Sequence, residues 1–101
     1  MVRNNITLDP SLLATFCEKH HIRRLSLFGS VLRDDFRPDS DVDMLVEFDP
    51  EHVPGFIGLC EMEFELGDRL GGRRIDLVTS RALNHLIRER VLNDAAVIYA
   101  S

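Results

Sequence analysis

The sequence predicts a small α/β domain in which helices cover one sheet of three or four strands. Segments with helical and with strand periodicity alternate along the chain, and its 101 residues suffice for one modest core. Apolar residues make up 45% and charged residues 29% of the chain, which is typical of a globular protein rather than a disordered one. We therefore expect residues 1–101 to form a single domain.

The chain is expected to begin with a helix and a strand. Asp9 followed by Pro10 predicts a helix over residues 10–20, with the aspartate as N-cap and the proline in the first turn. Apolar side chains recur on one face of this helix, at Leu12, Leu13, Phe16 and Cys17. Residues 22–28 are largely apolar and stop abruptly at Gly29, so we expect a strand there.

A short turn and a second strand follow. Residues 30–34 leave room for only one or two helical turns before a polar loop over residues 35–40. Residues 41–48 alternate between apolar and other side chains, which predicts a strand. The apolar positions of this strand are Val42, Met44, Val46 and Phe48. Asp49 and Pro50 end it.

The second half repeats the helix and strand pattern. Residues 56–70 have apolar positions at helical spacing, and the glycine pair 71–72 predicts the end of this long helix. Residues 73–78 are expected to form a third strand, and Ser80 the N-cap of a last helix. We expect four side chains of that helix to face the core: Leu83, Leu86, Ile87 and Val91. Residues 95–99 fit either a short strand or a docked tail.

Charge and hydropathy narrow the classes of function. The formal net charge of −5 argues against broad, sequence-independent binding of DNA or RNA, which normally needs a basic face. The sequence contains no apolar run approaching the roughly 20 residues that a membrane span needs. Its beginning, MVRNNITLDP, lacks the apolar stretch of a signal peptide. We therefore expect a cytoplasmic protein without membrane contact.

The first candidate binding feature is Gly29-Ser30, at the predicted junction between a strand and a short helix. Glycine lets the backbone approach a ligand closely, and the N–H groups at a helix start attract phosphate. The serine hydroxyl adds a further donor. Taken alone, the pair is also what a plain structural turn contains.

The second feature is Asp41-Val42-Asp43, which places two carboxylates on one face at the start of a strand. Two like charges about 4 Å apart repel by roughly 4 kcal/mol at an effective dielectric constant near 20. A fold that gathers them usually also gathers a cation, and hard oxygen ligands suit Mg²⁺ or Mn²⁺. The alternative is a solvated acidic turn.

The third feature is Asp76, which lies between Ile75 and Leu77 in what we expect to be a buried strand. Burial of a carboxylate is costly unless the group is paired or binds a metal. The sequence leaves both possibilities open, because Arg73 and Arg74 are close enough to pair with it.

In combination, these features resemble a known pattern. Gly29-Ser30, ten further residues, Asp41-x-Asp43 and a later strand carboxylate resemble the nucleotidyltransferase fold shared with DNA polymerase β. Within that superfamily the chain is similar to the minimal nucleotidyltransferases (MNT proteins), many of which are antitoxins encoded beside HEPN-domain toxins. The resemblance extends over residues 22–99 and includes FGSVLRDDFRPDSDVDMLVEF and RRIDLVT. It implies an α+β fold: a mixed sheet of three to four strands flanked by about four helices.

The resemblance also implies roles for single residues. Three carboxylates would bind two Mg²⁺ ions, or Mn²⁺ in their place: Asp41, Asp43 and Asp76. Four residues would contact the nucleotide ATP, namely Gly29, Ser30, Arg33 and Ser40. Gly29 and Ser30 would hold the β- and γ-phosphates, and Ser40 would orient the strand start. Asp76 would also assist deprotonation of the acceptor hydroxyl.

The functional hypothesis that follows is an antitoxin enzyme. It would transfer AMP from ATP to a hydroxyl group, by the resemblance a tyrosine hydroxyl, of a HEPN toxin with which it forms a hetero-oligomer. A second hypothesis is a non-catalytic antitoxin that neutralises its partner by occluding it. A third is transfer to a small molecule or to an RNA end, as in superfamily members that carry additional domains.

Overall fold

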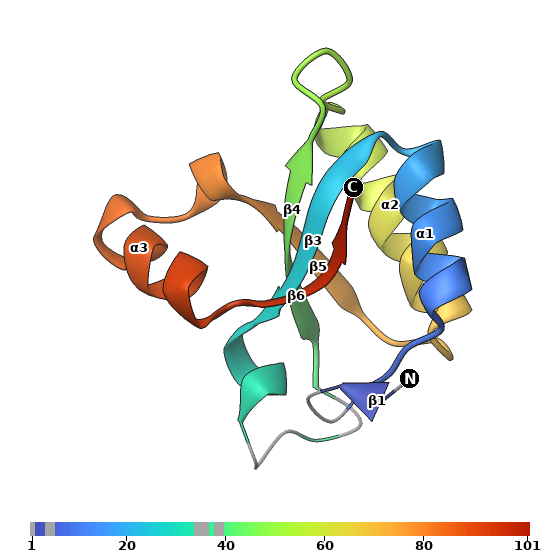
Figure 1. Ribbon diagram of the computed structural model, residues 1–101, viewed down its shortest axis with the longest axis horizontal. Helices are drawn as coiled ribbons and strands as arrows, with labels where there is room; N and C mark the ends of the chain where they lie inside the picture. The colour runs from blue at the N-terminus through green and yellow to red at the C-terminus, as the bar shows by residue number, and fades with distance from the viewer. Residues whose placement is uncertain (1, 4–5, 34–36, 38–39) are drawn as a thin grey trace.

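The computed structural model describes residues 2–3, 6–33, 37 and 40–101. Its centre is a four-stranded sheet with the strand order β5-β4-β3-β6 (Figure 1). β3 runs antiparallel to β4 and β6, whereas β4 and β5 are parallel. The strands span Ile22–Phe28 (β3), Val42–Phe48 (β4), Ile75–Thr79 (β5) and Ala96–Ala100 (β6). The predicted mixed sheet is confirmed, and the chain ends in a strand rather than a docked tail.

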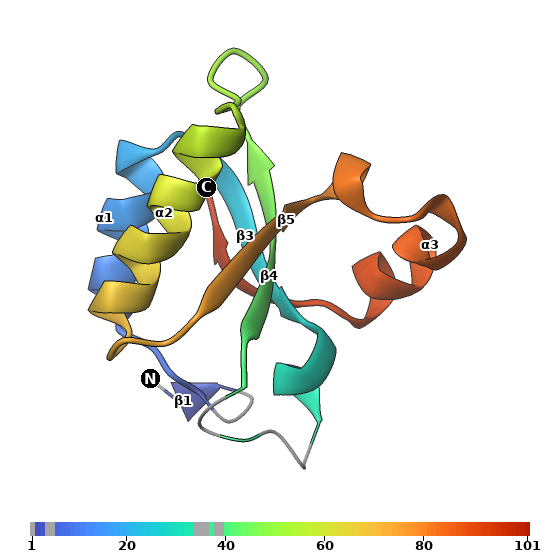
Figure 2. The same cartoon turned by 180° about the vertical axis from the view of Figure 1, so that it is seen from behind.

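Three α-helices occur in the described part of the chain: α1 (Pro10–Lys19), α2 (Phe56–Arg69) and α3 (His85–Asp94). α1 and α2 lie side by side against one face of the sheet, whereas α3 stands on the other side (Figure 1 and Figure 2). Two 3₁₀ turns, Gly29–Leu32 and Ser80–Ala82, follow β3 and β5. Among these described helices, none has both the length and the apolar character that a bilayer span requires.

The predicted start of α1 is confirmed. The Asp9 side chain accepts hydrogen bonds from the backbone N–H of Ser11, at 2.9 Å, and of Leu12, at 3.4 Å. Two otherwise unpaired amides of the first turn are thereby satisfied. The buried residues of α1 are Leu13, Phe16 and Cys17. The predicted apolar face therefore does cover the sheet.

Alternating residues of β3 and β4 form the centre of the main core. Leu25 pairs with Val46, and Leu27 with Met44, and none of the four is more than 1% exposed. Side chains of α1 and α2 complete this core, among them Leu13, Phe16, Met62 and Leu66. The intervening strand positions point to the opposite face, as the period of two requires. Polar side chains of β4 are thus presented away from α1 and α2.

A two-stranded antiparallel sheet precedes α1, and the sequence does not predict it. β1 (Val2–Arg3) pairs antiparallel with β2 (Ile6–Thr7). Strands of two residues are too short for periodicity to reveal. Ile6 and Leu8 are 3% and 1% exposed, so the beginning of the chain contributes to the core.

The predicted short helix over residues 30–34 is instead a 3₁₀ turn, Gly29–Leu32. Its single buried side chain is Val31, and Arg33 already has extended backbone. A 3₁₀ turn of this length is common where one buried residue must be placed between two elements. Residues 34–36 and 38–39 of the predicted turn and loop lie outside the described part of the chain.

The last helix differs most from the prediction. Ser80 starts a 3₁₀ turn, and Asn84 is the N-cap of α3, accepting a hydrogen bond from the Leu86 N–H at 2.9 Å. Of the side chains expected to face the core, Leu83 precedes α3 and is buried, whereas Leu86 is 79% and Ile87 49% exposed. Val91 is half-buried. Periodicity predicts which side chains share a helical face, but not whether another surface covers that face.

Gly67 of α2 allows the helix to approach the chain that enters β5, and its replacement is expected to destabilise the fold. A Cβ at this position would collide with the backbone carbonyl oxygen of Arg73. We expect Gly67→Ala to lower the free energy of unfolding by about 2 kcal/mol and Tm by roughly 10 °C. Chemical and thermal unfolding measure both quantities.

The matched control is Gly58→Ala in the same helix. The added Cβ there meets the Pro54 Cβ at 3.3 Å and no backbone atom. We expect the stability of this variant to stay within about 1 kcal/mol of wild type, because alanine favours the helix. Equal stability of the two variants would contradict the role given to Gly67.

Candidate active site

The turn after β3 brings Gly29 against Asp43. Gly29 has a φ of 75° and directly follows Phe28, whose register partner on β4 is Asp43. A Cβ at Gly29 would lie 2.6 Å from Asp43 Oδ2, closer than non-bonded atoms approach. Both the left-handed backbone and the short approach therefore require glycine. In the folded chain Gly29 therefore lies against the Asp41/Asp43 segment, as the combined motif predicts.

Ser30 connects this turn to the start of β4. Its Oγ donates a hydrogen bond to the backbone carbonyl oxygen of Asp41, at 3.5 Å. The next residue, Val42, donates its N–H to the carbonyl oxygen of Arg74, at 2.9 Å. The start of β4 is consequently held between the Gly29 turn and the segment that leads into β5.

Arg33 and Ser40 lie at the ends of the segment that joins β3 to β4. Arg33 is exposed, and its positive charge is one of the influences that act on the pKa of Asp43, lowering it. Ser40 is half-buried, immediately precedes Asp41, and donates its backbone N–H to the Arg37 carbonyl oxygen at 3.0 Å. The structure therefore brings Arg33 within electrostatic reach of the carboxylates and places Ser40 beside them in the chain.

Asp43 and Asp76 form a pair across the two parallel strands. They are register partners in β4 and β5, so their side chains share the sheet face opposite α1 and α2. The pKa of Asp43 is raised, first by burial and then by the negative charges of Asp76 and Asp41. Asp41 and Asp76 therefore both lie close enough to Asp43 to disfavour its negative charge.

Asp76 is exposed, and the expectation that it is buried was wrong. Its neighbours Ile75 and Leu77 are 8% and 3% exposed and face the core. β5 is an edge strand, and α2 covers only one of its faces, so the alternation that buries these neighbours exposes Asp76. Because Asp76 is exposed, it does not need the arginine partner that the sequence left open.

Glu63 of α2 is a fourth carboxylate at the site, and the sequence did not single it out. Its Oε2 accepts a hydrogen bond from the Leu77 N–H at 2.7 Å, on the open edge of β5. Burial raises the pKa of Glu63, the bond from Leu77 lowers it, and Asp76 raises it through both charge and hydrogen bonding. Glu63 lies next to Asp76 only because α2 packs beside β5, for which the sequence contains no local signal.

The carboxylates offer the donor chemistry that a hard divalent cation prefers. Asp41, Asp43 and Asp76 supply oxygen ligands only, which suits Mg²⁺ or Mn²⁺. Within the described residues no three such side chains already converge tightly enough to hold an ion. Asp41 is exposed and precedes β4, whereas strand register places Asp43 and Asp76 side by side. The oxygen-only donor set of these three residues therefore fits a hard divalent cation.

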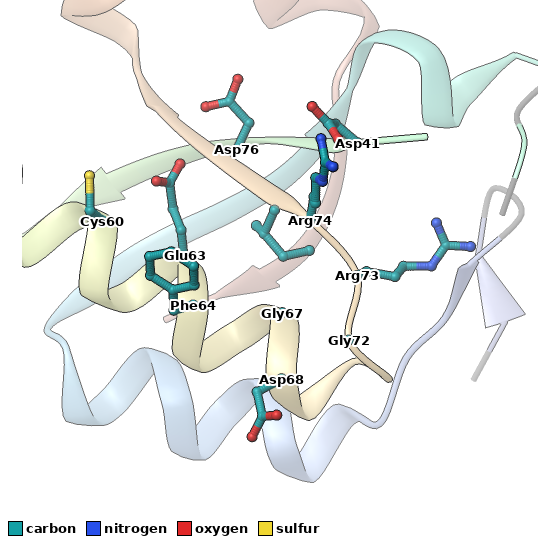
Figure 3. A pocket seen from close by; sticks show the side chains of 11 residues that line it. Asp41, Cys60, Glu63, Phe64, Gly67, Asp68, Gly72, Arg73, Arg74 and Asp76 are labelled. Carbon is teal, nitrogen blue, oxygen red and sulfur yellow. The ribbon is translucent and has the colours of Figure 1, made fainter. Parts of the chain in front are cut away.

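Two pockets open beside these carboxylates. One, of about 570 Å³, lies at the Gly29 turn and is lined in part by Arg33 and by Arg90 of α3. The other, of about 550 Å³, lies between α2 and the edge of β5 and is lined in part by Asp41 and Asp76 (Figure 3). The sequence leaves open whether Arg88 and Arg90 belong to a solvated helix face or line a triphosphate pocket or a partner surface, and the structure places Arg90 in the lining of the pocket at the Gly29 turn.

Comparison with known proteins identifies the family. The sequence matches the model described as polymerase beta, nucleotidyltransferase, over residues 11–101. The chain belongs to this family. It is a nucleotidyltransferase, and a nucleotide is accordingly its substrate.

The relatives of this nucleotidyltransferase include a named protein adenylyltransferase. The protein adenylyltransferase MntA of Thermococcus cleftensis is 36% identical over 81 residues, which cover 80% of this chain and 79% of the relative. This level of identity over most of both chains supports a shared family rather than a shared fold alone.

Solved structures show the same fold at lower identity. A toxin–antitoxin structure with AMP-PNP has a TM-score of 0.74 at 19% identity, covering 93% of this nucleotidyltransferase and 75% of that chain. A structure of a tri-AMPylated HEPN toxin of Shewanella oneidensis in complex with its MNT antitoxin has a TM-score of 0.65 at 18% identity. The match covers 91% of this chain and 70% of the other. At these identities the likeness concerns the fold.

Proposed function

We propose that this nucleotidyltransferase transfers AMP from ATP to a hydroxyl group of a partner protein and acts as the antitoxin of a toxin–antitoxin pair. The observation that carries the proposal is the meeting of Gly29 with Asp43 and Asp76 on one sheet face. The name of the Thermococcus relative and the AMPylated HEPN toxin in the Shewanella complex support a protein as acceptor. A HEPN-domain toxin with a tyrosine as acceptor is the partner that we propose.

The nucleotide is proposed to lie in the pocket at the Gly29 turn. The backbone of Gly29 and the hydroxyl of Ser30 bind the β- and γ-phosphates, and Arg33 neutralises part of their charge. Ser40 fixes the chain direction just before Asp41. Gly29 and Arg33 line this pocket, and Ser30 directly follows Gly29 in the chain.

The carboxylates are proposed to complete the site. Asp41, Asp43 and Asp76 hold two Mg²⁺ ions, which when bound supply Lewis-acid stabilisation of the triphosphate and activation of the acceptor hydroxyl. Asp76, at the exposed end of the group, accepts the proton of that hydroxyl and passes it to water. The acceptor oxygen bonds to the α-phosphorus as the bond to the bridging oxygen breaks, and pyrophosphate leaves.

Direct transfer of label tests this function. The purified chain is incubated with Mg²⁺, a purified HEPN-domain protein, and ATP labelled in the α-phosphate. We expect the label to appear on the HEPN protein together with released pyrophosphate. With ATP labelled in the γ-phosphate the protein should stay unlabelled, which separates AMP transfer from phosphorylation. Failure of the label to appear on the HEPN protein would refute that protein as the acceptor.

Arg90 is expected to bind the triphosphate, because it lines the same pocket as Gly29 and Arg33. Hydrogen bonds from a guanidinium to phosphate contribute about 1.5–3 kcal/mol. Arg90→Gln should therefore raise KM for ATP by about tenfold or more, with kcat little changed. Initial rates over a range of ATP concentrations measure both constants.

The matched control is Arg81→Gln, which removes the same charge from an exposed position of the 3₁₀ turn after β5. Arg81 lines a different pocket, with Val46 and Phe48, at the other end of the sheet. Its KM for ATP should equal that of wild type. If the two variants have the same KM, Arg90 has no part in nucleotide binding.

A further inference from the structure

The two pockets beside the carboxylates lie on different sides of them. The pocket at Gly29 is bordered by α3, whereas the second pocket follows the edge of β5 to α2 (Figure 3). Asp41 and Asp76 line the second pocket and thereby connect it to the proposed reaction centre. Any molecule seated there has direct access to Asp76.

The geometry of the transfer indicates which side of the carboxylates holds the leaving pyrophosphate and which side receives the acceptor. In an in-line displacement at phosphorus the attacking oxygen and the leaving oxygen lie on opposite sides of the phosphorus atom. With the leaving pyrophosphate at Gly29 and Ser30, the acceptor oxygen must arrive from the side of Asp76. The pocket between α2 and β5 is the described cavity that lies on that side.

The outer face of α2 forms an apolar rim on this pocket. Phe56, Cys60 and Phe64 are four residues apart and so share one helical face. Phe56 and Phe64 are each 81% exposed, and Phe64 and Cys60 also line the pocket. Exposed aromatic side chains beside a polar site are typical of surfaces that bind another protein.

The charges of the rim argue against a nucleic-acid acceptor. Glu63 and Asp68 of α2 line the pocket along with the carboxylates of the reaction centre. Arg73 and Arg74 line its other wall, so negative groups outnumber positive ones. A phosphate backbone would be repelled by Glu63 and Asp68, and it would gain nothing from the phenylalanines at the mouth.

We propose that the acceptor protein docks along the outer face of α2 and inserts its hydroxyl-bearing side chain between Phe64 and the edge of β5. This inference rests on the proposed function and assigns the surface that serves it. A tyrosine suits the pocket, since its ring can pack on Phe64 while its hydroxyl reaches Asp76. The neighbouring side chains of the docked segment are apolar, to match Phe56 and Phe64.

The test compares Phe64→Ser with Leu86→Ser, which removes a similarly exposed apolar side chain (79%) from α3. The probe is a purified HEPN-domain protein, and its binding to each variant is titrated by calorimetry. AMP transfer is measured in parallel. We expect Phe64→Ser to raise Kd and the KM for the HEPN protein by about tenfold, with KM for ATP unchanged. Leu86→Ser should resemble wild type.

The two readouts separate this proposal from the proposed function. If wild type binds the HEPN protein but transfers no AMP, while Phe64→Ser weakens binding, the docking surface stands and the activity is refuted. If wild type transfers AMP and Phe64→Ser binds and transfers equally well, the docking surface is refuted and the activity stands. Weaker binding by Leu86→Ser alone would assign docking to α3 and refute it too. Because Phe64 is exposed, thermal unfolding of both variants should match wild type.

Discussion

Replacing both Asp41 and Asp43 by asparagine is expected to reduce AMP transfer by about 10³-fold or more. Asparagine keeps the size of the side chain but removes the negative charge that holds a divalent cation. The raised pKa of Asp43 reflects burial and the charges of Asp76 and Asp41. Removing this repulsion should leave the free energy of unfolding unchanged or slightly higher. Transfer from ATP labelled in the α-phosphate and thermal unfolding measure the two effects.

The control for this variant changes two carboxylates away from the site. Glu61 and Glu89 are exposed and line neither the pocket at Gly29 nor the pocket at Asp76. Replacing both by glutamine removes the same net charge and should leave transfer at the wild-type rate. Undiminished transfer by the double asparagine variant would exclude the two-metal mechanism.

The same double asparagine variant distinguishes catalysis from occlusion. The exposed aromatic side chains of α2, Phe56 and Phe64, would suit a protein partner even without catalysis. Co-expression of the variant with the HEPN protein therefore decides the point. Loss of protection of the host cells would show that transfer neutralises the partner, whereas full protection would show that occlusion suffices.

Gly29→Ala is expected to have the second largest effect on transfer, because the added Cβ both strains the backbone and collides with Asp43. A non-glycine residue at a φ of 75° costs about 1–3 kcal/mol. The added Cβ would also lie 2.6 Å from Asp43 Oδ2 and would displace that carboxylate. A shift of about 1 Å at a reacting group lowers the rate by roughly 10²-fold. We expect losses in both Tm and kcat.

Gly71→Ala separates the two causes. Gly71 has a similar φ of 82°, but a Cβ there meets nothing within 4 Å. This variant should share the loss in Tm and keep the rate of transfer. If Gly71→Ala and Gly29→Ala lower kcat equally, strain of the backbone alone explains the effect, and the contact with Asp43 does not matter.

Local patterns were sufficient to predict most elements of the sheet and its covering helices. The strand over residues 22–28 has the predicted bounds, and α1 begins at Pro10 because Asp9 can satisfy its first amides. Helix caps, chain reversals and alternation depend on neighbouring residues, so the sequence carries them directly. Whether the apolar face of α3 is buried depends on which surface lies opposite it, and the prediction that this face is buried was wrong.

The sequence by itself determined which chemistry is present: a glycine and a serine after a strand, two carboxylates at the start of the next strand, and a third in a later one. Their spacing is a property of the chain. Only the tertiary structure decided that Asp76 is exposed beside Asp43, that Glu63 joins it and that Arg90 lines the pocket at Gly29. These contacts join residues from different elements, whose distances are set by strand register and helix packing rather than by neighbours in the chain.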